Sequence, residues 1–311
     1  MTATLTRARR SRPSRRQAVI AFLVLTGPMI LGLLVFKYVA IAWAFLLSFS
    51  DGRRTIQLGQ WVGFDNYAQL LGDDRFRESL VVIVAFTAFI VPVTFAASLA
   101  LAVLVNRVRR GRALFRTSFL IPAAVSYVAA TLVWKMALFN GLPTGIANAI
   151  GLTLFDADPV PWIQTEDPPL YWVVLISLRL WLQVGLYMIL FLAGLQAIPR
   201  QLYEAAALDG AGSWARFRYV TLPQLRNTSV AILLLLLIAA MQAFDEFYNL
   251  FSSGLGGAGS AAVRPPLVYL YDVALKDQNY GVGSAGAFVI TLLIIIVTLL
   301  QGRISGFGRK G

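Results

Sequence analysis

One uncharged stretch in the second half of the chain constrains its fold more than any other feature. Val230 to Phe244 contain no charged residue, and Leu233 to Ile238 form an unbroken aliphatic run within them. A helix at the surface of a soluble protein keeps a polar face, which this run lacks. About 20 mostly apolar residues are needed to cross a hydrocarbon core of about 30 Å. The stretch therefore predicts a membrane-spanning helix.

Further stretches of the same kind occur along the whole chain of 311 residues, of which 58% are hydrophobic and only 14% charged. A soluble domain has about 25% charged residues, so a soluble globule of this size is excluded. The sequence predicts an all-α, polytopic membrane protein with six transmembrane helices. We divide it into a basic tail, 1–16, and a transmembrane domain, 17–311. We place the six spans near residues 17–47, 79–105, 114–139, 170–197, 227–250 and 284–302.

The excess of basic residues, which gives a net charge of +12, predicts how the spans are oriented. Most Arg and Lys residues lie before the first span, between the second and third, between the fourth and fifth, and after the sixth, where the only acids are Glu204 and Asp209. Basic residues collect in cytoplasmic loops. We therefore expect a multi-pass membrane protein with both termini in the cytoplasm, in contact with the lipid bilayer and not with nucleic acid.

The predicted cytoplasmic loop, 198–223, reads as two short helices joined by a tight turn. Pro199 is suited to open a helix, because its missing N–H would be unpaired there. Gly210 can adopt the left-handed conformation that ends a helix. Ser213 can cap a second helix, and Pro223 precedes the fifth span. By itself this pattern also describes an ordinary pair of helices at the membrane surface.

The spacing of particular residues in this loop resembles a known signature. Glu204-Ala205-Ala206 is followed by three residues and Gly210, then by nine residues and the aliphatic Val220, and after one more residue by Leu222-Pro223. This spacing resembles the signature loop of the inner-membrane permeases of binding-protein-dependent ABC importers. The segments 193–199, 63–71 and 119–122 resemble the carbohydrate branch of that family, whose members import maltose, trehalose or glycerol-phosphate. The matching residues are Glu204, Ala205, Ala206, Gly210, Val220, Leu222 and Pro223.

This resemblance implies that the loop is a coupling segment, which transmits motion from an ATPase to the spans. The implied location is the bacterial cell (inner) membrane. The implied partners are a second homologous permease, two ATP-binding cassette ATPase subunits and an extracytoplasmic solute-binding protein. The chain has no Gly-x-x-x-x-Gly-Lys-Ser/Thr loop, so we expect ATP to be used by the partner and no cofactor to be bound here. The residues expected to couple to the ATPase are Glu204, Ala205, Ala206, Asp209, Gly210, Leu222 and Pro223.

Polar and aromatic residues within the later spans are candidates for a substrate pathway, since polar groups are costly inside a membrane. Aromatic rings and amide, carboxylate and hydroxyl groups together suit a sugar. The acidic pair in this set is equally consistent with a turn at the outer membrane interface, and the role of Arg179 and of the Gly-rich loop 252–260 stays open. The candidates are Gln183, Tyr187, Gln242, Phe244, Asp245, Glu246, Tyr248 and Asn249.

Two other classes of function compete with an importer subunit for a sugar or sugar-like solute. A self-sufficient secondary transporter or channel for a small polar solute would carry charged relays and broken helices, of which Arg179 is the main sign. A membrane-embedded enzyme would need an acid or base within the spans. The chain contains no His and no Cys, which leaves Asp245 and Glu246 for that role. We therefore expect no catalytic residue and no metal site.

Overall fold

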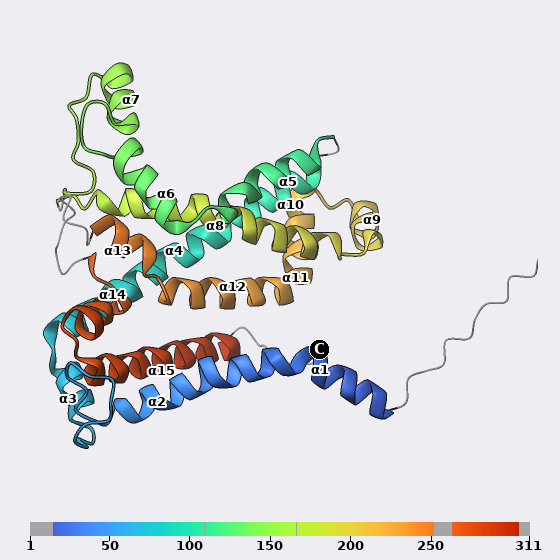
Figure 1. Ribbon diagram of the computed structural model, residues 1–311. Helices are drawn as coiled ribbons and strands as arrows, with labels where there is room; N and C mark the ends of the chain where they lie inside the picture. Colours follow the sequence, from blue (N-terminus) through green and yellow to red (C-terminus); the bar gives the residue numbers. More distant parts are fainter. Residues whose placement is uncertain (1–14, 109, 166, 252–262, 305–311) are drawn as a thin grey trace, which may run out of the picture.

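The computed structural model describes residues 15–108, 110–165, 167–251 and 263–304, so most of the basic tail and the loop 252–260 lie outside it. The described residues form a bundle of helices without a β-strand, and the only extended pairings are two isolated bridges, Ser50 with Trp61 and Arg53 with Asn279. The long helices run side by side along one direction (Figure 1). The expected all-α class is confirmed.

Five helical segments are long and apolar enough to cross a membrane, and a bent pair raises the possible number to six within the described residues. The sixfold pattern expected from the sequence is thus present, with one span in two pieces. The first span contains a π-helical part, Leu34–Val39. The fifth span, α12 to α13, is interrupted near its end. The five segments are α1 to α2 (Arg15–Leu47), α4 (Asp74–Arg107), α8 (Tyr171–Gln196), α12 to α13 (Arg226–Phe251) and α15 (Tyr280–Ile304).

The third span lies where it was expected, near 114–139, but it is sharply bent, which the sequence analysis did not predict. Two helical pieces, Arg112–Ala124 and Tyr127–Leu138, meet at 95°. Pro122 lies in the 3-10 turn that ends the first piece, α5 (Arg112–Leu120) with its extension, and proline has no N–H to continue a helical ladder. Val125 and Ser126 are extended. Ser126 is the N-cap of α6 (Tyr127–Val133), whose C-terminal extension Trp134–Leu138 is π-helical.

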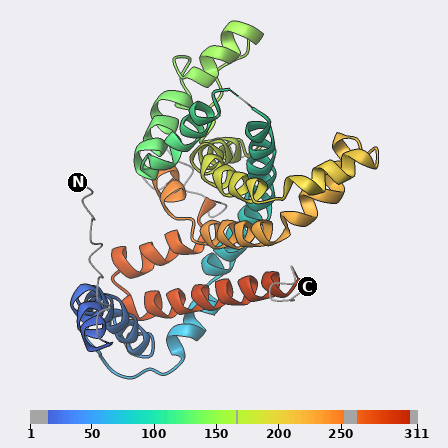
Figure 2. The same cartoon turned by 90° about the vertical axis from the view of Figure 1, so that its right-hand side faces the viewer.

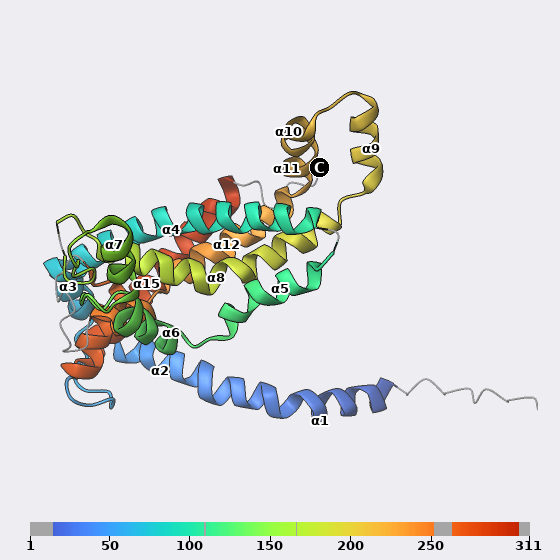
Figure 3. The same ribbon diagram turned by 90° about the horizontal axis from the view of Figure 1, so that it is seen from above.

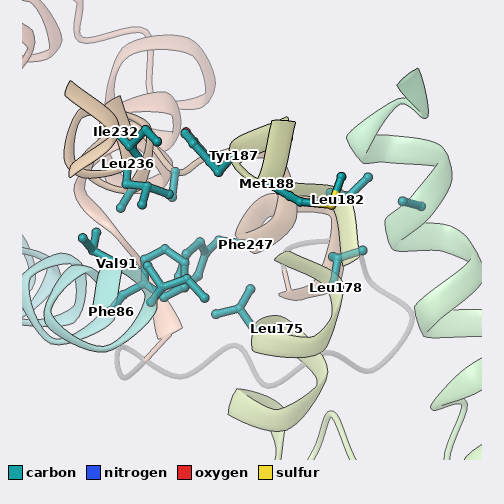
Figure 4. Packing of buried hydrophobic residues seen from close by; sticks show 14 of the residues in the cluster. Phe86, Val91, Leu175, Leu178, Leu182, Tyr187, Met188, Ile232, Leu236 and Phe247 are labelled. Carbon is teal, nitrogen blue, oxygen red and sulfur yellow. The ribbon is translucent and has the colours of Figure 1, made fainter. Parts of the chain in front are cut away.

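The main core lies between α4, α8 and the broken span α12 to α13. Phe86 of α4, Leu178 and Met188 of α8 and Phe247 of α13 are completely or almost completely buried, and Figure 4 shows the Phe86 and Phe247 side chains against each other between the helices. Lipid tails are as apolar as leucine, so close packing rather than exclusion from water holds such helices together. The order of the spans in the bundle therefore depends on the fit of these side chains.

A glycine allows the first piece of the broken third span to lie directly against α8. A Cβ atom at Gly185 of α8 would collide with the carbonyl oxygen of Phe119 in α5. Small residues allow such close approach between membrane helices. The close contact of α5 with α8 thus depends on glycine, which has no side chain, at position 185.

The first span and α15 form a second layer of the bundle (Figures 1 and 2). The most apolar window of the first span contains no buried residue, whereas α15 packs on α2 (Ala40–Leu47), α3 (Asp65–Gly72) and α12. A smaller cluster, centred on Leu70, Phe76 and Tyr269, joins α3, the start of α4 and α14 (Pro266–Tyr271). This layer leaves apolar surface for lipid or another subunit.

The segment between the third and fourth spans contains a helix that the sequence analysis did not predict. The helix α7 (Ile146–Phe155) is apolar and has 10 residues, about half the length that a bilayer requires. Asn148 fixes it by donating from Nδ2 to the Val160 carbonyl (3.0 Å), while its Oδ1 accepts from the Trp162 indole (2.7 Å). The helix lies at the end of the bundle opposite to α9 (Figure 1).

Candidate functional site

The loop after the fourth span folds into short helices that we call the coupling arm, residues 199–224. The arm extends away from the bundle (Figures 2 and 3). Its second half is irregular, because a π-helical segment separates two very short α-helices. The elements are α9 (Arg200–Leu208), α10 (Ser213–Arg216), the π-helix Phe217–Thr221 and α11 (Leu222–Gln224).

The turn of the arm has the geometry that the sequence predicts. Pro199 is the N-cap residue of α9, and Gly210 has φ of +75°. The Gly210 N–H donates to the Ala207 carbonyl (3.1 Å), and the Ala211 N–H donates to the Ala206 carbonyl (2.9 Å). This pair of bonds is a Schellman motif, which satisfies carbonyls at the helix end. The expected role of Gly210 as helix terminator is confirmed.

The expected cap by Ser213 is wrong. Gly212, with extended backbone (φ −69°, ψ 173°), is the residue at the boundary of α10, and Ser213 is already the first helical residue. The two halves of the arm are instead joined by side chains, because the hydroxyl groups of Tyr203 and Thr221 lie 3.0 Å apart in a hydrogen bond. The arm is therefore held as a unit by the Gly210 turn and this contact.

The residues of the signature lie mostly on the surface of the arm. Glu204, Ala205, Asp209, Gly210 and Pro223 are exposed, while Ala206 and Leu222 are partly buried. None of the α9 residues is buried, and Leu208 is 90% exposed. An apolar side chain so far out in water, beside small residues and one carboxylate, offers a surface on which another protein can pack.

The candidate substrate residues divide into two groups. On α8, Tyr187 is buried and Gln183 donates from Nε2 to the Tyr127 hydroxyl (2.9 Å). The others surround the point where α12 (Arg226–Met241) ends and α13 (Asp245–Phe251) begins. Gln242 and Asp245 are exposed there, and Phe244, Tyr248 and Asn249 are partly buried. The structure thus brings most of this second group to one break in the fifth span.

Arg179 of α8 occupies the inner side of this break. Its guanidinium pairs with the Glu246 carboxylate, and its Nη2 donates to the Ala239 carbonyl (2.6 Å). Ala239 belongs to the last turn of α12 and Glu246 to the first turn of α13. The side chains of Arg179 and Glu246 are only 4% and 2% exposed. One buried cation therefore joins both halves of the broken helix.

No local pattern in the sequence indicates this pairing, because the two partners are 67 residues apart. A signal was nevertheless present, since a charge within an apolar span requires a partner of opposite sign. Glu246 is one of the few acids in the later spans. Its burial shows that it faces the bundle, whereas its neighbour Asp245 is on the surface.

An aromatic cluster lies beside the break, made of Phe244, Tyr248 and Tyr271. The Phe244 and Tyr248 rings are stacked with centroids 5.2 Å apart, and the Tyr271 ring stands edge-on to Tyr248 at 4.9 Å. The Lys276 ammonium lies 5.4 Å from the Tyr248 ring centroid and 2.7 Å from Asp272 Oδ1. Flat rings next to hydrogen-bonding groups are the chemistry that a sugar surface requires.

Comparison with known proteins agrees with this architecture. Residues 94–306 match the family model described as binding-protein-dependent transport system inner membrane component. The arabinooligosaccharides transport system permease protein AraP of Bacillus subtilis (strain 168) is 31% identical, with 90% of this chain and 87% of that protein covered. The trehalose/maltose transport system permease protein MalF of Thermococcus litoralis is also 31% identical, with 94% and 96% covered.

The fold is similar to that in a crystal structure of a bacterial ABC transporter involved in the import of alginate. The TM-score is 0.81 and the identity 22%, with 95% of this chain and 98% of that chain covered. Identity this low supports the fold alone. The family model, by contrast, covers more than half of the chain, including the whole coupling arm and the broken fifth span. The chain therefore belongs to the inner membrane components of binding-protein-dependent transport systems, the permease subunits of ABC importers.

Proposed function

We propose that this chain forms half of the translocation pathway of an ATP-driven importer for a sugar or sugar-like solute. The observation that carries the proposal is the coupling arm, which protrudes from the bundle and has most of its signature residues on its surface. The sugar class is supported by the aromatic cluster at the break and by relatives named for arabinooligosaccharide and for trehalose and maltose transport. ATP is hydrolysed by a partner subunit, and this chain contributes no catalytic residue.

The arm docks on the ATPase through Glu204, Ala205, Ala206, Asp209 and Gly210. The small alanine side chains let the backbone of α9 approach a groove closely. Leu208 and Glu204, both exposed, supply an apolar and an acidic contact. Leu222 and Pro223 pass the motion of the arm into α12, since α11 leads directly into that helix.

The test is sugar uptake in cells that carry Glu204→Gln, compared with Gln201→Ala at another exposed position of α9. The Glu204 variant should insert normally, lose most of its uptake and release the ATPase during mild-detergent purification. The Gln201 control should keep both properties. Wild-type uptake by the Glu204 variant would contradict the coupling role.

Purification from mild detergent also separates this proposal from a self-sufficient transporter. We expect an ATPase and a second six-span permease to be recovered with the chain, and a solute-binding protein to stimulate uptake. The orientation is part of the proposal: both termini and the coupling arm face the cytoplasm, as the distribution of basic residues predicts. Uptake by the chain reconstituted alone, without ATP, would contradict it.

The pathway is proposed to follow the break in the fifth span, with Gln242, Phe244, Asp245, Tyr248 and Asn249 in contact with the solute. Gln183 and Tyr187 on α8 continue this path, and Glu246 shapes it through its pair with Arg179. Tyr248→Ala should raise the KM for uptake by about tenfold, because stacking against one ring is lost. Tyr248→Phe, which keeps the ring, should stay near the wild-type value.

A further inference from the structure

Two adjoining cavities lie at the end of α4 where it meets the coupling arm, the region seen beside α10 in Figure 3. One has a volume of about 290 Å³ and polar walls that include Asn106 and Tyr203. The other has a volume of about 610 Å³ and an apolar lining that includes Leu99 and Leu104. The cavities adjoin each other, because Val103, Arg107, Ser213 and Phe217 line both.

The polar cavity is basic. Arg107 and Arg216 line it, and among the described residues that line either cavity none is acidic. The Nε of Arg216 is buried and has no hydrogen-bond partner among the described residues. A buried donor without an acceptor is unfavourable, and a guanidinium binds phosphate oxygens well. The cavity thus presents the groups that an anionic phosphate would satisfy.

The apolar cavity is about as long as one half of the hydrocarbon core of a bilayer is thick. It follows α4 from Ala96 to Arg107, which at about 1.5 Å per residue is about 16 Å. Half of a hydrocarbon core is about 15 Å thick. Ala96 and Ala100 are exposed and small, so they leave a channel open along the helix surface. Trp214, 74% exposed at its end, is a residue type enriched at the membrane interface.

We propose that these two adjoining cavities together bind one anionic phospholipid. Its phosphate contacts Arg107 and Arg216, and one acyl chain lies in the apolar channel along α4. A phospholipid fits the basic cavity and the apolar cavity at once, because its charged headgroup and its acyl chains meet at the membrane interface. The last turn of a spanning helix such as α4 lies at the same interface. Basic pockets at the cytoplasmic ends of spans are suited to anionic headgroups.

This lipid site is separate from the proposed solute pathway. Its wall includes the arm residues Ser213, Trp214, Arg216 and Phe217. The bound lipid braces the base of the coupling arm against α4. The inference rests on the proposed membrane orientation and not on the identity of the solute. Its test therefore measures lipid and needs neither ATP nor sugar, so a failure of the transport proposal would be seen separately.

The experiment uses the purified transporter with its partner subunits, reconstituted into nanodiscs of phosphatidylcholine with or without 20% phosphatidylglycerol. Native mass spectrometry after extraction counts the retained lipids. The wild type should keep one phosphatidylglycerol per copy of this chain. The double variant Arg107→Gln and Arg216→Gln should keep about tenfold less. A matched control, Arg110→Gln and Arg200→Gln, removes the same charge from exposed positions at the same end of the bundle and should behave as the wild type.

A second variant tests the acyl channel without changing charge. Ala100→Trp fills the channel from the lipid-facing side of α4 and should also lower phosphatidylglycerol retention, while the recovery of the assembled transporter reports folding. Equal retention of phosphatidylcholine and phosphatidylglycerol by the wild type would overturn the proposal. Undiminished phosphatidylglycerol in the double variant would overturn it too, as would a photo-crosslink from position 214 to a protein subunit instead of lipid.

Discussion

The coupling arm and the break in the fifth span differ in where their charged groups lie and whether these groups are paired within the chain. The arm closes its own backbone through the Gly210 turn and leaves Glu204 and Leu208 exposed. The break buries its charges and pairs them within the chain, Arg179 with Glu246. Groups left exposed and unshared are available to another subunit, whereas groups satisfied inside the chain fix its own shape. Substitutions in the two regions should therefore be separable by experiment.

The largest effect is expected at the buried pair. Arg179→Met leaves the Glu246 carboxylate buried without a partner and the Ala239 carbonyl without its donor, which should lower the free energy of unfolding by about 3 kcal/mol. Thermal unfolding of the purified transporter measures this change. The double variant Arg179→Met and Glu246→Leu removes both charges, and we expect it to recover a large part of the loss. A double variant as unstable as the sum of both single variants would show that the pair is not coupled.

A smaller loss of stability, with a larger loss of uptake, is expected at the turn of the arm. Gly210 has φ of +75°, and a side chain in the left-handed region costs about 1–2 kcal/mol. Gly210→Val should therefore distort the end of α9 and abolish most uptake while the spans stay folded. Gly212→Ala is the matched control, because Gly212 has a negative φ and open space around it. Normal uptake with Gly210→Val would remove the turn from the coupling mechanism.

These two regions also differ in how far the sequence predicted them. The arm was predicted in detail, because its turn depends on local residue types: Pro199 at the start and Gly210 at the end. Only the cap at Ser213 was wrong. The polar and aromatic residues around the break were singled out by their composition, but the break itself was not predicted. The pairing of Arg179 with Glu246 depends on how α8 packs against α12, which no local pattern encodes.

The spans show the same division between local and long-range information. Hydrophobic length alone placed five of them, because the bilayer imposes that length on each helix independently. The bend of the third span was not predicted from Pro122, because a proline is tolerated in membrane helices when neighbouring groups satisfy the backbone. The contact between Gly185 and Phe119 that positions the first piece is set by packing.

The end of the bundle opposite to the coupling arm gives a prediction of intermediate size. Tyr269 of α14 donates to Asp73 Oδ2 (2.7 Å), and Asp73 caps α4 by accepting from the Arg75 N–H (2.8 Å). Burial and the Asp73 carboxylate raise the pKa of Tyr269, so the bond should persist through the physiological range. Tyr269→Phe should lower the free energy of unfolding by about 1 kcal/mol. Tyr219→Phe, at an exposed position of the arm, should change it little.

The smallest effect is expected at Lys276, which pairs with Asp272 one turn earlier beside the aromatic cluster. The hydrogen bond to Asp272 raises the pKa of Lys276 above its usual value. The stabilisation is therefore complete below the pKa of the unfolded chain, near 10.4, and is lost as the pH rises through the folded value. Because the Lys276 side chain is 49% exposed, the contribution should stay under about 0.5 kcal/mol. Unfolding of Lys276→Met at pH 8 and pH 11 checks this: the difference from wild type should shrink at the higher pH, and a difference that grows there would assign the stability to another group.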